Sequence, residues 1–147
     1  MNRRRGLAFV VALLIAGCGD ATSPRDELRD AEQRWAAWGP TSYDLTIYPA
    51  CECLLYPVIV SVREGVVTSR AYVAIVGLPM PDGSAVHYPD VPGLFARIRS
   101  ELAENHVGSV EYDALTGYPV RIVFDYDGPD INGVDGEIFY DMVVVRR

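Results

Sequence analysis

The sequence predicts an α+β domain, in which a six-stranded, mostly antiparallel sheet carries two helices packed on one face. Apolar residues recur at helical spacing in two stretches, one before Gly39 and one before Asn105. Elsewhere apolar and polar residues alternate in six short segments that are bounded by Gly, Pro, Asp or Asn. The resulting order is a helix, three strands, a second helix and three further strands.

The first helix is expected to begin at Pro24. Ser23 suits the N-cap, proline suits the first helical position, and Asp26 lies at the third. The apolar residues of this helix are Leu28, Ala31, Trp35 and Trp38. Gly39 and the proline after it end the helix. We expect the two tryptophans to cap one face of the sheet; the alternative is an exposed aromatic contact for a ligand or partner.

Three strands follow in the first half of the chain, at 43–48, 58–62 and 67–71. Glu64 and Gly65 form a two-residue hairpin turn between the second and the third. The predicted register sets Val67, Ser69 and Ala71 opposite Val62, Val60 and Val58. It leaves an outer face that carries Ser61, Arg63, Arg70 and Tyr72.

The second half repeats this order. Asp90 caps a helix that buries Leu94, Ile98 and Leu102 and ends near Asn105. Strands are expected at 110–112, 118–126 and 138–145, with a hairpin loop at 113–117 and an acidic loop at 127–137. The segments Tyr56-Pro57-Val58 and Tyr118-Pro119-Val120 each open a middle strand, which suggests duplication of an αβββ unit.

Residues 1–17 have the layout of an export signal, with a basic start at Arg3–Arg5 and an apolar run at Leu7–Ile15. The run is too short to span a bilayer. Ile15-Ala16-Gly17-Cys18 resembles a bacterial lipobox, in which the cysteine is lipidated and becomes the first mature residue. We therefore expect a signal peptide at 1–17, a lipidated Cys18 with a tether to residue 23, and a single domain at 24–147.

The anchor predicts an extracytoplasmic protein that is attached to a bacterial membrane by acyl chains such as palmitate. Asp20 lies one place later than the inner-membrane retention signal of Gram-negative lipoproteins, which favours the outer membrane there. The formal charge is −7, and loss of Arg3, Arg4 and Arg5 makes the mature chain −10. Such an acidic chain is repelled by nucleic acid, so we exclude nucleic-acid binding.

The order of several motifs resembles the family called DUF6174, a bacterial secreted and lipoprotein domain of unknown function. The motifs are a helix with Trp35, then Tyr43, Cys51-x-Cys53, Pro57-Val58, Gly117-Tyr118-Pro119 and a downstream acidic loop. They span about residues 25–145. The resemblance implies the compartment and the fold, and it implies no activity.

Cys51 and Cys53 remain after lipidation of Cys18, and in an oxidising compartment they are expected to form a disulfide. Such a bridge needs a bend in the chain, because two positions along a flat strand lie near the upper limit of Cα separation. Reduced core thiols, a redox-active pair and metal ligands are the alternatives. No Cys-x-x-Cys spacing and no second pair of ligands supports the last two.

The acidic loop offers hard oxygen ligands that suit calcium. The candidates are Asp127, Asp130, Asn132, Asp135 and Glu137. Their spacing departs from the EF-hand loop, because Val134 stands where an acid belongs. A solvated hairpin loop is the favoured interpretation, so we expect no metal or other cofactor.

His87 and His106 are the only histidines, and no nucleophile elbow accompanies them, so they are expected at the surface or at helix ends. No catalytic residues are found. The sequence thus favours a non-enzymatic binding module at the cell envelope. Its exposed sheet face, with Arg63, Arg70 and Tyr72, would receive a protein partner. The alternative function is a thiol-disulfide or metal-handling protein that uses Cys51 and Cys53.

Overall fold

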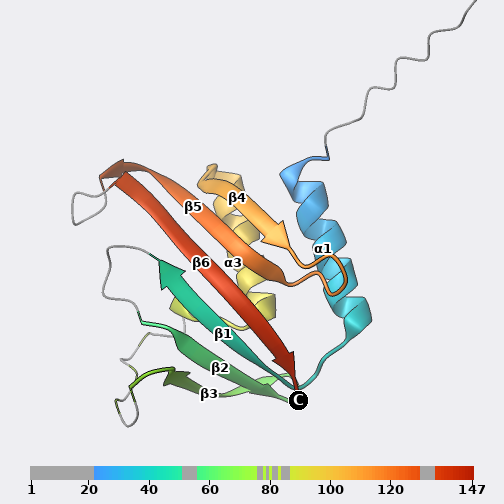
Figure 1. The fold of residues 1–147 in the computed structure, drawn as a ribbon. Coiled ribbons are helices and arrows are strands. Elements are labelled where there is room, and N and C mark those ends of the chain that lie inside the picture. The colour runs from blue at the N-terminus through green and yellow to red at the C-terminus, as the bar shows by residue number, and fades with distance from the viewer. Residues whose placement is uncertain are drawn as a thin grey trace, which may run out of the picture.

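The structure, a computed structural model, describes residues 22–50, 56–75, 78, 80, 83, 87–129 and 135–147. The elements are α1 (Pro24–Trp38), β1 (Tyr43–Ala50), β2 (Val58–Arg63), β3 (Val66–Tyr72), α3 (Val91–Glu104), β4 (Val107–Tyr112), β5 (Pro119–Pro129) and β6 (Asp135–Arg146). This order confirms the predicted α+β class. Both helices lie on the same side of the sheet, and no described element covers the other side (Figure 1).

The six strands form one open sheet in the order β3-β2-β1-β6-β5-β4. Every neighbouring pair is antiparallel. The first and last strands of the chain, β1 and β6, are therefore paired at the centre, where Leu45 lies opposite Val144 and Ile47 lies opposite Met142. The edges of the sheet are β3 and β4.

Capping residues fix the ends of both helices at the predicted positions. Asp26 N donates a hydrogen bond to Ser23 Oγ at 3.2 Å, and Gly39 ends α1 in the left-handed conformation. At α3 Gly93 N donates to Asp90 Oδ1 at 2.9 Å, and Asn105 takes the same left-handed conformation. These side chains satisfy backbone groups that a helix leaves unpaired at its termini.

The core lies between the helices and the covered face of the sheet. Fully buried side chains from the strands alternate with outward ones, as the period of a strand requires. The buried set includes Leu45, Ile47, Val58, Val60, Val62, Ile122 and Phe124 from the sheet and Leu28, Ala31, Leu94 and Ile98 from the helices. Burial of these apolar surfaces is the main favourable contribution to folding.

The strand order contradicts duplication of an αβββ unit. The strands β1, β2 and β3 step outward from the centre of the sheet, whereas β4, β5 and β6 step inward from an edge. Because all neighbouring strands are antiparallel, β4 and β1 run in opposite directions. Superposing β4 on β1 with the helices on the same side of the sheet therefore needs a half-turn about the sheet normal. After that half-turn β5 and β6 lie on the side of β1 that is opposite to β2 and β3. The two halves share an element order but have opposite hands.

The acidic loop between β5 and β6 is shorter than predicted. The backbone of Asp127–Pro129 belongs to β5 and that of Asp135–Glu137 belongs to β6, so the strands extend six positions into the predicted loop. Pairing of Asp125 with Glu137 and of Pro129 with Asp135 continues the ladder between β5 and β6. Tertiary pairing here overrides the low strand preference of Asp and Gly.

Among the described residues, neither helix is long and apolar enough to cross a membrane.

Candidate functional site

The uncovered face of the sheet is the first candidate binding surface. Its outward residues on the two central strands include Tyr48, Val143 and Val145, whose exposed fractions are 42%, 48% and 46%. Thr46 lies opposite both Val143 of β6 and Ile59 of β2, so the apolar surface continues across three strands. Open antiparallel faces are normally polar, and contiguous exposed apolar surface is typical of an interaction site.

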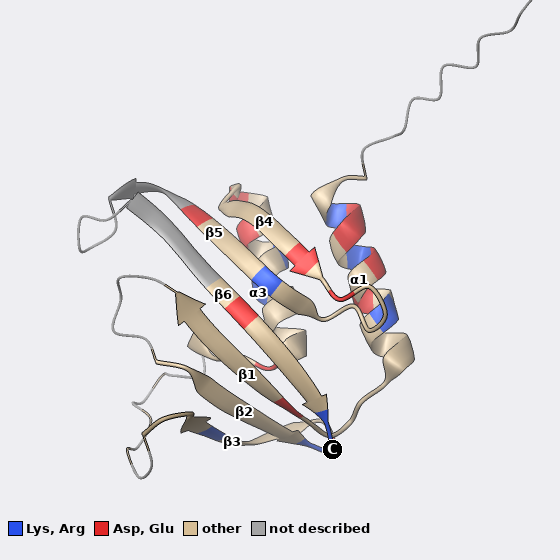
Figure 2. Cartoon of the chain, in the orientation of Figure 1, with Lys and Arg blue, Asp and Glu red and all other residues tan. Residues whose placement is uncertain are grey.

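Charged residues also lie on this open face, because Glu111, Arg121 and Asp141 share one row of the register with Tyr48. Figure 2 shows red and blue positions along β4, β5 and β6, with α3 behind the sheet. Asp44 lies between two arginines, with Arg63 Nη1 at 2.9 Å from Oδ1 and Arg147 Nε at 2.7 Å from Oδ2. Burial raises the pKa of Asp44, but hydrogen bonds from Arg63 and Arg147 outweigh it and hold that pKa below its usual value. Arg121 and Asp141 form a looser pair at 3.9 Å.

The predicted outer face was wrong for Arg70 and Tyr72. The register of β2 and β3 shifts between Ser61 and Val62, so Arg70 pairs with Val60 and Tyr72 with Val58. Since Val60 and Val58 face the core, Arg70 and Tyr72 lie on the helix side. Arg70 Nε donates to the carbonyl of Tyr88 at 2.7 Å, and the Tyr72 ring packs edge-on against Tyr56 with 5.7 Å between centroids. Arg63 keeps its outward position.

The tryptophans of α1 cap the sheet, as predicted. The Trp35 ring is 9% exposed, and its centroid lies 5.3 Å from those of both Trp38 and Tyr43. Tyr118 adds a further edge-on contact at 6.3 Å. Such arrangements suit the charge distribution of aromatic rings. The cluster is part of the core and offers no exposed aromatic pair.

Two buried tyrosines tie the loops to the core. Tyr88 Oη donates to the carbonyl of Tyr56 at 2.8 Å and accepts from the Tyr56 amide at 3.2 Å. Tyr43 Oη accepts from the amide of Val91 at 3.3 Å. Burial raises the pKa of Tyr43 to about 12 and also raises that of Tyr88. Both phenols therefore stay protonated and act as structural hydrogen-bonding groups.

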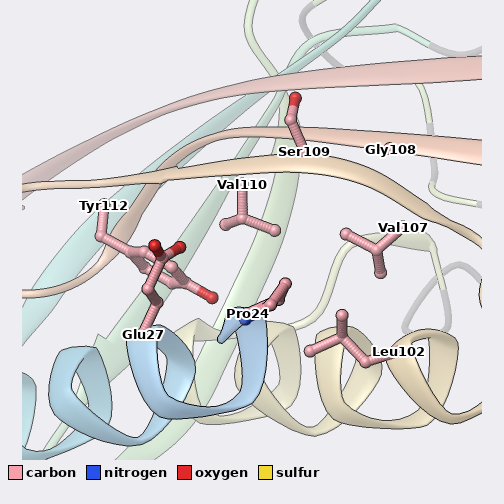
Figure 3. Close-up of a pocket in the computed structure, with 8 residues that line it drawn as sticks. All are labelled: Pro24, Glu27, Leu102, Val107, Gly108, Ser109, Val110 and Tyr112. Carbon is pink, nitrogen blue, oxygen red and sulfur yellow. The ribbon is translucent and has the colours of Figure 1, made fainter. Parts of the chain in front are cut away.

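A cleft between the edge strand β4 and the two helices is the second candidate surface, and sequence reasoning missed it. Its volume is about 240 Å³, and Figure 3 shows β4 on one side with α1 and α3 on the other. Its apolar wall is formed by Pro24, Leu102, Val107, Val110 and Tyr112. Val107 and Val110 both point toward the helices, whereas Ser109 points away from them. A register shift in the pairing with β5, between Val107 and Ser109, permits this arrangement.

One end of the cleft is acidic. The Glu27 carboxylate and the Tyr112 ring lie close together there (Figure 3). Burial raises the pKa of the Tyr112 phenol, the charges of Glu27 and Glu32 raise it further, and Arg34 lowers it. Tyr112 is therefore a protonated hydrogen-bond donor. Beyond it the cleft widens into an open hollow of about 480 Å³ that Arg34 also lines.

Several predicted site residues lie outside the described part of the chain, namely Cys18, Cys51, Cys53, Asp130 and Asn132. Of the other calcium candidates, Asp127 lies in β5, and Asp135 and Glu137 lie in β6. No group of three His, Cys, Asp or Glu side chains that could hold a metal occurs among the residues searched, which are the described ones.

The histidines lie where the sequence predicts them. His87 is exposed. His106 directly follows the C-cap of α3, and its Nδ1 lies 3.1 Å from Glu101 Oε2. His106 therefore belongs to the end of a helix.

Comparison with models of known protein families gives a match. The family described as "Family of unknown function (DUF6174)" matches residues 27–146, which confirms the resemblance expected from the motifs. No curated protein and no solved structure matches the chain.

Proposed function

We propose that this chain, which belongs to the DUF6174 family of unknown function, is a lipid-anchored, non-enzymatic binding module of the bacterial cell envelope. In this proposal residues 1–17 are a signal peptide, and Cys18 carries acyl chains such as palmitate. The lipobox at Ile15–Cys18 supports the anchor. Several acyl chains on one cysteine hold a protein durably, whereas a single chain binds only marginally.

Cys51 and Cys53 form a structural disulfide in this proposal. They are the cysteines that remain once Cys18 is lipidated, and an oxidising compartment favours their pairing. The chain binds no cofactor for its activity. The membrane is contacted through Cys18 and not through the acidic domain, whose charge is repelled by anionic headgroups.

The observation that carries the binding function is the uncovered face of the sheet. Tyr48, Val143 and Val145 remain exposed on the two central strands, where antiparallel sheets normally place polar residues. The face has the apolar centre and polar rim of a protein–protein interface, because the ion pairs of Asp44 and Asp141 border the apolar residues. The expected partner is therefore an envelope protein and not a small substrate.

Site-specific photo-crosslinking in the native host tests this function. A photoreactive phenylalanine analogue is placed at Val143 on the open face, or at Ala37, which is exposed on α1, as control. We expect a discrete cross-linked protein adduct from position 143 and none from position 37. Absence of an adduct at position 143, or the same adduct from both positions, contradicts the proposal.

A further inference from the structure

The free edge of β4 and the cleft beneath it form one continuous surface. Among the described strands, β4 is hydrogen-bonded to β5 and to no other. Alternate residues of an edge strand point their backbone N–H and C=O groups away from the sheet, where another strand can pair with them. In Figure 1 α1 stands beside β4, beyond this edge. A strand added to β4 would therefore lie over α1 and over the mouth of the cleft.

The cleft suits one apolar side chain. An engineered cavity of about 150 Å³ lined by apolar residues holds benzene, and this cleft has about 240 Å³. A leucine, methionine or phenylalanine side chain fits that space. Because successive side chains of a strand point to opposite faces, every second residue of an added strand faces the helices. One of these would reach between Leu102, Val107 and Val110.

The acidic residues around the cleft select the charge of the segment that binds. Glu27 lines the cleft, and the adjoining hollow is lined by Glu27, Asp30 and Arg34, so that acidic side chains outnumber the basic one there. The domain as a whole is acidic. A second copy of the chain would bring the same negative charge to the contact, whereas arginine or lysine side chains are attracted by it.

We propose that the cleft binds an extended, basic segment of a partner protein, which pairs with β4 as a seventh strand and inserts one apolar side chain. Main-chain hydrogen bonds to β4 supply affinity, and the cleft supplies sequence preference, as in other recognition by strand addition. Positively charged residues on the helix-facing side of the segment lie near Glu27. This site is separate from the open sheet face, so the chain has two binding surfaces.

A displayed library of random heptapeptides, selected on the full chain in detergent, tests this proposal. We expect selected peptides to share one apolar residue with Arg or Lys two positions away. Methylating the backbone nitrogens of a selected peptide on its pairing edge should weaken binding about tenfold or more, because it removes main-chain donors. Selection of no peptides, or of peptides that tolerate this methylation, overturns strand addition.

Variants of the chain locate the site. Val110→Phe fills the cleft, and its matched control is Val66→Phe on the opposite edge strand β3, where the native side chain is 64% exposed. Glu27→Arg reverses the charge at the cleft, and Glu64→Arg in the β2–β3 turn is its control of equal net charge. We expect the cleft variants to bind the selected peptides about tenfold or more weakly than the native chain, and the control variants to bind them with unchanged affinity.

The same variants exclude other occupants. Charge reversal at the exposed Glu27 leaves the core unchanged, so it remains informative if Val110→Phe does not fold. Val143→Asp on the open face should leave peptide binding intact, which separates this site from the proposed partner face. Equal binding to the cleft variants and their controls overturns the proposal. So does a concentration-dependent dimer that Val110→Phe abolishes, because the occupant is then a second copy of the chain.

Discussion

Gly117 is the residue that lets the β4–β5 loop pack against α1. Its φ of +82° lies in the left-handed region, and a Cβ built there would be 2.2 Å from the carbonyl oxygen of Ala31 and 2.8 Å from Cβ of Arg34. Glycine is thus required both by the turn and by the close approach of a helix backbone. Asp113 completes the loop by accepting hydrogen bonds from Leu115 and Thr116.

Gly117→Ala should therefore destabilise the protein by about 2–4 kcal/mol, since positive φ and a backbone clash both act against it. Gly65→Ala is the matched control, because Gly65 has φ +78° with no atom within 4 Å of the added Cβ. The control should cost only about 1 kcal/mol. Denaturant unfolding measures both changes. Equal losses would mean that the contact with α1 does not restrict the loop.

Asp44 makes stability depend on pH. Because Arg63 and Arg147 hold its pKa low in the folded chain, the carboxylate stabilises the fold above the pKa that it has when unfolded. That stabilisation is lost as the pH falls through the lowered pKa of the folded state. Asp44→Asn should cost about 1–2 kcal/mol at pH 7 and nothing once the native carboxyl is protonated.

Asp141→Asn is the control for Asp44, since its pair with Arg121 is longer and more exposed and should contribute little at any pH. Unfolding curves at neutral and acidic pH compare the two variants with the native chain. A loss for Asp44→Asn that persists unchanged in acid would show that packing, and not charge, explains its effect.

At the scale of elements, helix limits were predictable and strand register was not. Ser23, Gly39, Asp90 and Asn105 mark the ends of α1 and α3 through contacts within a few residues, which a sequence pattern records. The positions of Arg70 and Tyr72 depend on a register shift between β2 and β3 that no local sequence pattern indicates. One extra residue in a strand moves every side chain beyond it to the opposite face of the sheet.

The cleft could not be predicted for a similar reason. Its walls come from the start of α1, the end of α3 and β4, so it exists only once α1 has packed beside the edge of the sheet. Val107 and Val110 look unrelated in the sequence, because they are three positions apart, whereas residues on one face of a regular strand are an even number of positions apart. The strand order of the sheet is likewise set by long-range pairing.

Ser23→Ala tests the local signal at α1. Ser23 Oγ accepts a hydrogen bond from the amide of Asp26 and donates one to its carboxylate at 2.6 Å. Loss of this cap should cost about 1 kcal/mol of unfolding free energy. Thr22→Ala, one residue before the cap, should change nothing measurable. If both variants unfold at the same denaturant concentration as the native chain, the cap does not contribute to helix stability.

At the scale of the whole molecule, the proposed tether would link the two proposed surfaces to a membrane. Thr22 lies in the hollow that adjoins the cleft, and Cys18 is four residues before it. Four extended residues span at most about 14 Å. The cleft and the edge strand β4 therefore lie near the proposed anchor. A partner segment that reaches them would come from a protein close to the same membrane.

The intact mass of the chain purified from its native membrane tests the central claim most directly. We predict a chain that begins at Cys18, carries the added mass of several acyl chains, and changes on Cys18→Ser to a form without lipid. A chain that retains Met1, or one that begins after Gly17 without lipid on Cys18, contradicts the anchor and with it the account of an envelope-bound module.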